Sequence, residues 1–147
     1  MIAVDTNILV YAHRIESEFF QPAAAAIRRL AESEEQWAIP WPCLHEFLAV
    51  VTHPRIFRVP SPIEAAISQI EIWRESPSLK LIGESGDYWR TLGEILTQGK
   101  IVGPKVHDAR IAAICRAHGV RELWSADRDF SRVRNMKVTN PVLHFTK

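Results

Sequence analysis

The chain has 147 residues, of which 47% are hydrophobic and 24% are charged, and its formal net charge is +1. This length and composition fit one globular domain spanning residues 1–147, and they exclude wholesale disorder. The near-zero charge gives no global signal for a polyanionic partner, so any such contact must come from local basic clusters.

Two features of the sequence predict a cytoplasmic protein. No stretch approaches the ~18 consecutive apolar residues of a membrane span, and no basic segment precedes the short apolar N-terminal run. Cys43 and Cys115 lie in apolar segments without the spacing of metal ligands. We expect both to be buried and reduced, with a disulfide as the less favoured alternative.

Apolar runs and helical patterns alternate along the chain. Strands are predicted at residues 2–4, 36–39, 79–82 and 122–125, with 137–139 as a candidate fifth. Helices are predicted after Asp5, over 23–30, from Pro42, from Pro62, over 88–97 and over 107–118. Loops are expected at 53–60 and 99–105. This alternation predicts an α/β fold, with a mostly parallel central sheet of four to five strands and helices on both faces.

Acidic residues stand at the ends of predicted strands and on the helices expected beside them. Asp5 closes the first apolar run, and Asp127 follows the fourth. Open α/β sheets place their ligands at the carboxyl ends of strands. Glu46 and Asp108 lie on helices that the alternating pattern would pack beside those strands. Taken singly, each acid has an ordinary explanation as a helix cap, a turn residue or a solvated side chain.

Taken together, these acids predict a metal site. Crowded carboxylates repel one another unless they are protonated or bridged by hard cations such as Mg²⁺ or Mn²⁺. A cation held in this way makes water more acidic and suits the hydrolysis of phosphate esters. Asp129 lies close enough to Asp127 in the sequence to compete as a ligand, and the sequence leaves that choice open.

Four segments follow one another in a recognisable order. They are Asp5-Thr6-Asn7-Ile8-Leu9, Glu46 in a mid-chain helix, Asp108-x-x-Ile111-Ala112-Ala113, and Ser125-Ala126-Asp127-Arg128-Asp129-Phe130. In this order and at these separations they resemble the PIN domain and, more narrowly, the VapC-type toxins of bacterial toxin–antitoxin pairs. The resemblance runs from the first residue to about Phe130, and the loop His53-Pro54-Arg55-Ile56-Phe57 also looks like one found in a branch of these toxins.

The resemblance implies a single PIN-like nuclease domain with a metal-dependent endoribonuclease activity. In that family Asp5, Glu46, Asp108 and Asp127 would form the acidic cluster that holds Mg²⁺ or Mn²⁺, with Asp129 as a supporting or alternative ligand. Thr6 and Asn7 would orient Asp5 through hydrogen bonds. Ser125 stands where a threonine is more often found, and it keeps the hydroxyl group.

The resemblance also implies partners. RNA would be the substrate, a VapB-type antitoxin would block the acidic pocket with its C-terminal segment, and the chain would form a homodimer. Lys105, Arg110 and Arg128 flank the last two acids and are candidate contacts to the RNA backbone, although each alone is more simply a solvated surface cation.

Two other functions stay open at this stage. A metal-dependent phosphatase could use Asp5 as a nucleophile, but that chemistry usually needs a second aspartate two residues later, where Asn7 stands. A non-catalytic binding module could retain the same fold. The sequence does not identify the target RNA, the cleavage sequence, the antitoxin or the number of metal ions.

Overall fold

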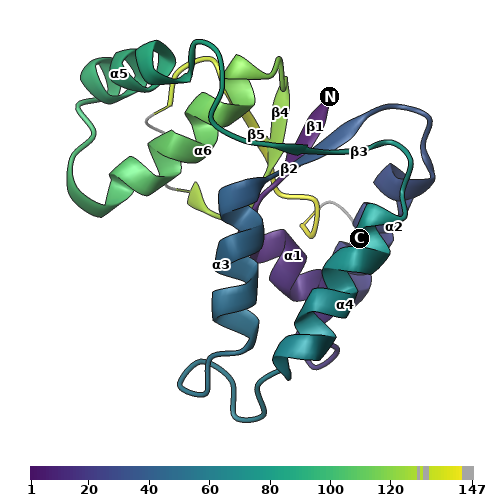
Figure 1. Cartoon of the computed structure of the whole chain (residues 1–147). Helices are drawn as coiled ribbons and strands as arrows, with labels where there is room; N and C mark the ends of the chain where they lie inside the picture. Colours follow the sequence, from purple (N-terminus) through teal and green to yellow (C-terminus); the bar gives the residue numbers. More distant parts are fainter. Residues whose placement is uncertain (129, 131–132, 144–147) are drawn as a thin grey trace.

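A five-stranded parallel sheet forms the centre of the computed structural model, with the strand order β3-β2-β1-β4-β5 (Figure 1). The model describes residues 1–128, 130 and 133–143. The strands are β1 (Ile2–Val4), β2 (Trp37–Pro40), β3 (Leu79–Ile82), β4 (Glu122–Trp124) and β5 (Lys137–Thr139). The predicted parallel α/β sheet is confirmed, and the candidate fifth strand is part of it.

Helices cover both faces of this sheet. They are α1 (Thr6–His13), α2 (Phe20–Glu32), α3 (Trp41–Val51), α4 (Ile63–Arg74), α5 (Tyr88–Gly99) and α6 (Val106–Ala117), with a short 3₁₀ turn η1 (Gly103–Lys105). Figure 1 shows α1 to α4 on one side and α5 and α6 on the other. The chain crosses the sheet in one direction from β1 to β3 and returns in the other direction from β3 to β4. Because crossovers between parallel strands are right-handed, the two directions place their helices on opposite faces of the sheet.

The change of direction creates a crevice at the carboxyl ends of β1 and β4. From β1 the chain continues to β2 and β3 on one side, whereas β4 and β5 lie on the other side of β1. At such a point the connections of neighbouring strands leave toward opposite faces and open a space at the edge of the sheet. Asp5 follows β1 directly, and its backbone N–H donates to the carbonyl of Trp124, the last residue of β4, at 2.9 Å.

The centre of the sheet is buried because β1 and β2 are apolar on both faces. Trp37, Ala38 and Ile39 of β2 and Ala3 and Val4 of β1 are fully buried. Continuous apolar strands are typical of parallel sheets covered by helices on both faces. Alanines on the buried side of α6 let this helix approach the sheet closely, and α6 contacts both β2 and α5.

The observed boundaries of several elements differ from the predicted ones. Strand β2 extends to Pro40, which pairs with Ile82 of β3, and β4 ends at Trp124. Helix α5 continues to Gly99, and the left-handed conformation of Lys100 (φ 49°) ends it. The segment 99–105 was expected to be a loop throughout, but it contains η1, which Pro104 permits because proline fits an early helical position.

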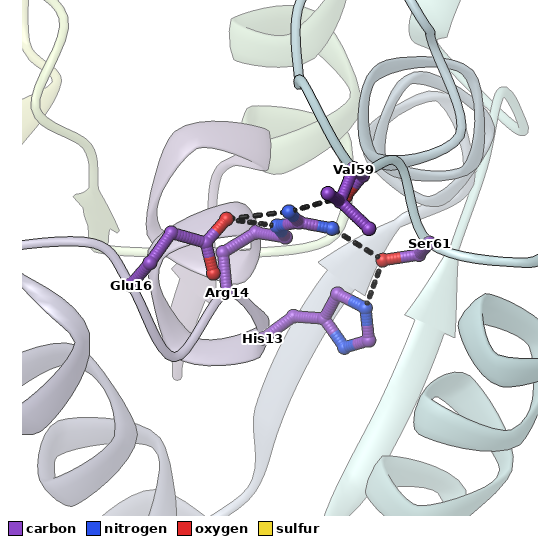
Figure 2. Close-up of polar contacts among 5 residues, drawn as sticks. All are labelled: His13, Arg14, Glu16, Val59 and Ser61. Carbon is purple, nitrogen blue, oxygen red and sulfur yellow. Dashed lines mark hydrogen bonds and ion pairs between the residues drawn. The ribbon is translucent and has the colours of Figure 1, made fainter.

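The loop between α3 and α4 is tied to the end of α1 by polar contacts (Figure 2). Arg14 donates from Nη2 to the Val59 carbonyl at 2.7 Å and from Nη1 to Ser61 Oγ at 3.0 Å. It also pairs with Glu16, and its guanidinium lies 4.3 Å from the centroid of the Phe57 ring. His13 Nε2 lies 2.9 Å from the same Ser61 hydroxyl. These contacts hold the far ends of α1 and α3 together.

Two further predictions about the fold can be checked directly. Cys43 and Cys115 are buried and free, so the expected reduced pair is confirmed. None of the described helices is long and apolar enough to cross a membrane.

Candidate active site

A cavity of about 620 Å³ opens at the carboxyl ends of β1 and β4, where the chain changes direction across the sheet. The four acids singled out from the sequence line it: Asp5, Glu46, Asp108 and Asp127. Asp5 caps α1 and Asp127 follows β4, whereas Glu46 comes from α3 and Asp108 from the first turn of α6. The structure therefore brings these carboxylates around one space from four separate parts of the chain.

Asp5 is held rigidly by its neighbours. Oδ1 accepts the backbone N–H of Thr6 at 2.8 Å, which makes Asp5 the N-cap of α1. Oδ2 accepts the hydroxyl of Ser125 at 2.7 Å, and the thiol of Cys43 lies 3.5 Å from Oδ1. Because both oxygens are engaged, Asp5 has one fixed orientation at the floor of the cavity.

Ser125 connects the two aspartates that follow strands. Its hydroxyl donates to Asp5 and accepts the backbone N–H of Asp127 at 3.0 Å. Asn7 donates from Nδ2 to the same hydroxyl oxygen at 3.3 Å, and its Oδ1 accepts the backbone N–H of Ala126 at 3.1 Å. Asn7 thus reaches Asp5 through Ser125 rather than directly.

Thr6 contacts two of the acids that line the cavity. Its backbone N–H contacts Asp5, but its hydroxyl donates to Glu46 Oε2 at 3.1 Å. This bond fixes the Glu46 carboxylate on the α3 side of the cavity, although Glu46 is exposed as a whole residue. The Thr6-Asn7 pair therefore contacts three parts of the site: Asp5, Glu46 and the Ser125-Ala126 segment.

Burial raises the pKa of Asp5 above its ordinary value. Hydrogen bonds from Ser125, Thr6 and Cys43 act in the opposite direction, and the charge of Glu46 adds to the increase. Repulsion between acids that share one cavity is relieved by a positive charge between them. The cavity is therefore electrostatically suited to a cation.

The donor chemistry fits a hard divalent cation held partly through water. Carboxylate oxygens are the ligands that Mg²⁺ and Mn²⁺ prefer. Among the described residues, no three His, Cys, Asp or Glu side chains stand close enough to form one coordinating group. Mg²⁺ usually binds one or two carboxylates directly and keeps several of its waters, so acids spaced around a cavity suit it.

The predicted cations lie at different distances from the cavity. Arg110 lines it, and its Nε lies 2.5 Å from Glu84 Oε1. Arg128 is exposed and lines an adjoining hollow that shares Tyr11 and Asp127 with the acidic cavity. Lys105 closes η1 and does not line the cavity. Asp129, the alternative fourth acid, lies outside the described residues.

Three residues at the site were missed or given no role from the sequence. Tyr11 and His107 line the cavity. Glu84 binds Arg110, and it follows β3 after one glycine. A position just beyond a strand is the signal that singled out Asp5 and Asp127, and it could have identified Glu84 as well.

A parallel α/β sheet with carboxylates gathered at the point where its strand order reverses defines the class of this protein. The chain belongs to the PIN-domain family, whose model matches residues 2–136.

Among curated proteins, ribonuclease VapC48 of Mycobacterium tuberculosis is 30% identical over 137 residues, which cover 93% of this chain and 94% of that protein. Ribonuclease VapC43 of the same organism is 28% identical over 142 residues, covering 97% and 96%.

Solved structures show the same fold. VapBC2 from Rickettsia felis, bound to a DNA fragment from its promoter, matches with a TM-score of 0.68 and 23% identity over 95% of this chain and 98% of that one. VapC20 of Mycobacterium tuberculosis, described as a sarcin–ricin loop cleaving toxin, matches with a TM-score of 0.64 and 19% identity over 89% and 93%.

Proposed function

We propose that this chain, as one nuclease domain over residues 1–147, is a divalent-metal-dependent endoribonuclease and the toxin of a type II toxin–antitoxin pair. The observation that carries the proposal is the arrangement of Asp5, Glu46, Asp108 and Asp127 around one cavity. The similarity to curated VapC ribonucleases over nearly their whole length supports RNA as the substrate.

Each acid has a distinct proposed part. Asp5 and Asp108 would hold Mg²⁺ or Mn²⁺, and Glu46 and Asp127 would complete the negative cavity around the ion and its waters. A bound divalent cation would supply an acidified water and neutralise charge on the phosphate. Thr6, Asn7 and Ser125 would keep the carboxylates in place, and Arg110 would attract the RNA backbone.

The geometry gives less support to a phosphatase with Asp5 as nucleophile. Asn7, at the position where such an enzyme needs an acid, is bound to Ser125 and to the Ala126 backbone. Trapping a phosphorylated aspartate would reverse this preference. A non-catalytic module would show no cleavage of RNA and no binding of Mg²⁺.

The direct test is RNA cleavage with Mg²⁺ or Mn²⁺ and with EDTA, comparing the wild type with Asp5→Asn and Asp108→Asn. We expect EDTA to abolish cleavage and each substitution to reduce it by at least about 100-fold, because each removes a charge from the proposed metal site. Glu71→Asn is a suitable control, since Glu71 lies on α4 and does not line the cavity. Undiminished cleavage by both site variants would refute the assignment.

The proposed partner is a VapB-type antitoxin that closes the acidic cavity. Structures similar in fold include VapBC from Salmonella typhimurium bound to DNA and a toxin–antitoxin complex from Klebsiella pneumoniae. Coexpression with the product of a neighbouring small reading frame tests this. Copurification together with loss of RNA cleavage is expected, and a complex that still cleaves RNA at the wild-type rate would contradict inhibition at the cavity.

A further inference from the structure

An ion pair stands at the edge of the acidic cavity and joins two different elements. Arg110 lies on α6, and Glu84 lies in the connection between β3 and α5. Arg110 Nε donates to Glu84 Oε1 at 2.5 Å, and the two side chains are 40% and 35% exposed, respectively. The pair is therefore partly open to solvent and within reach of an entering ligand.

Arg110 has a special place in the charge distribution of the cavity. It is the only lysine or arginine among the described residues that line the cavity, where the other ionisable side chains are four carboxylates, Tyr11 and His107. An RNA backbone that enters this space meets repulsion from the acids. A guanidinium binds phosphate oxygens through two parallel N–H groups, so Arg110 is suited to hold one phosphate against that repulsion.

His118 contacts both neighbours of Glu84, Gly83 and Ser85. His118 Nε2 donates to the carbonyl of Gly83 at 2.9 Å and lies 3.1 Å from Ser85 Oγ. The carboxylate of Glu84 can therefore leave Arg110 by rotation of its own side chain, without movement of the loop. Burial disfavours ionisation of Glu84, but its hydrogen bonds, including the one from Arg110, outweigh this and lower its pKa. Glu84 is thus a carboxylate at neutral pH.

A carboxylate and a phosphodiester compete for the same donors of a guanidinium. Solvent-exposed ion pairs of this kind contribute little to stability, so a phosphate can displace the acid at a small energetic cost. The geometry thus fits an internal anion that keeps Arg110 in place until the substrate arrives.

We propose that Glu84 occupies the position of a substrate phosphate on Arg110, and that RNA entering the cavity displaces it so that Arg110 binds a phosphodiester beside the cleaved one. Glu84 then competes with the substrate for Arg110. It lowers the affinity of the site for any RNA backbone that makes no other contacts with the protein. The identity of the ligand as RNA rests on the proposed ribonuclease function, but the phosphate-binding chemistry of Arg110 does not.

Binding of a fluorescently labelled single-stranded RNA in EDTA tests the proposal without cleavage. We expect Glu84→Gln to bind RNA about two- to five-fold more tightly than the wild type, because the exposed competitor is weak. Arg110→Gln should bind more weakly, and its dependence on salt should be shallower by about 0.7 in the logarithmic slope, as for one lost phosphate contact. When Arg110→Gln is already present, adding Glu84→Gln should not increase the affinity for RNA.

Glu71→Gln is the matched control, because it removes one negative charge from an exposed pair with Arg74 on α4, away from the cavity. Equal tightening by Glu71→Gln would show an effect of net charge alone and overturn the proposal. Weaker binding by Glu84→Gln would also overturn it, since Glu84 would then orient Arg110 for the substrate instead of competing with it.

A second measurement separates this proposal from the ribonuclease function. Dimethyl phosphate, a simple phosphodiester anion, is titrated while the Nε–Hε NMR signal of Arg110 is followed. The signal should shift at two- to five-fold lower concentrations in Glu84→Gln than in the wild type. This result in a protein that cleaves no RNA would refute the ribonuclease and support the phosphate site. No shift of the Arg110 signal in either protein would refute the phosphate site, whether or not RNA is cleaved.

Discussion

At the scale of single residues, the site depends on a few polar atoms that serve several partners at once. The hydroxyl of Ser125 donates to Asp5 and accepts from the Asp127 backbone and the Asn7 side chain. A buried hydroxyl with three partners is costly to remove, because each partner loses its hydrogen bond where water does not easily replace it. The Oγ atom of Ser125 therefore contacts both aspartates that follow strands, Asp5 and Asp127.

We predict that Ser125→Ala reduces RNA cleavage by about 10- to 100-fold, which is typical for residues that orient metal ligands. Ser125→Thr keeps the hydroxyl and should retain most of the activity. Cleavage rates of both variants at saturating Mg²⁺ provide the comparison, and circular dichroism reports whether the fold is retained. Equal loss in the alanine and threonine variants would mean that side-chain volume, rather than the hydroxyl, matters at this position.

The two cysteines give a second prediction at this scale. Burial raises the pKa of Cys115 to about 12 and the pKa of Cys43 well above its ordinary value, and both thiols are fully buried. We expect neither to react with a thiol reagent such as Ellman's reagent in the native protein at neutral pH, and both to react after unfolding in urea. Rapid labelling of the native protein would contradict the buried positions.

The same pKa shift has a consequence for stability. Because the folded-state pKa of Cys115 lies above its ordinary value of 9.0, the neutral thiol favours the folded state fully below pH 9.0. That contribution is lost as the pH rises from 9.0 to about 12. The free energy of unfolding should therefore fall over this range, and it should fall less in Cys115→Ala once that variant's own stability is subtracted.

At the scale of elements, the contacts of Arg14 decide how the α3–α4 connection is held. The side chain is 12% exposed, and it bonds two positions of this connection, Val59 and Ser61. A charged donor bonded to a carbonyl and a hydroxyl, and screened from water, is worth more than a surface ion pair. Arg14 therefore acts as a clip between α1 and the loop that joins α3 to α4.

We predict that Arg14→Gln lowers the free energy of unfolding by about 2 kcal/mol, in line with the loss of hydrogen bonds from a charged group. Trypsin should then cleave faster after the exposed Arg55 and Arg58 in the released loop. Arg74→Gln serves as the control, because that side chain is 53% exposed and its pair with Glu71 should contribute less than about 1 kcal/mol. Urea unfolding measures both variants, and equal effects would show that Arg14 has no special role.

At the scale of the whole molecule, the resemblance to VapC-type toxins predicts a homodimer. The surface of the chain also leaves several large apolar side chains exposed to water. The isoleucines among them are Ile15, Ile56, Ile63, Ile67 and Ile72. Light scattering after size exclusion should give twice the 16.8 kDa mass of one chain. A mass of one chain in the absence of antitoxin would contradict the prediction.

Much of the architecture could be predicted from local pattern. The strands at residues 2–4, 79–82 and 137–139 were placed with the observed bounds, because short apolar runs between helical patterns leave few alternatives. The boundaries that shifted depend on contacts beyond the local sequence. Pro40 remains in β2 because β3 pairs with it, and α5 ends only where Lys100 adopts a left-handed conformation.

The candidate site was predictable to a lesser degree. The positions of Asp5 and Asp127 after strands pointed to the sheet edge, but nothing local distinguishes Glu46 or Asp108 from solvated acids on other helices. They were singled out because the alternating pattern would pack their helices beside those strands, and the resemblance to a family then gave them a role. Asn7 contacts Asp5 through Ser125, and the Thr6 hydroxyl bonds to Glu46. Both contacts join segments far apart in the chain, so the sequence did not predict them.

The sequence by itself determined the alternation of strands and helices and the position of Asp5 directly after the first strand. Residue spacing and side-chain polarity decide these features within a few positions of the chain. Only the tertiary structure decided that Glu84 meets Arg110 and that Ser125 bridges two aspartates. Such meetings depend on the order of the strands and the handedness of the crossovers, which bring carboxyl ends and helix starts from distant segments to one edge of the sheet.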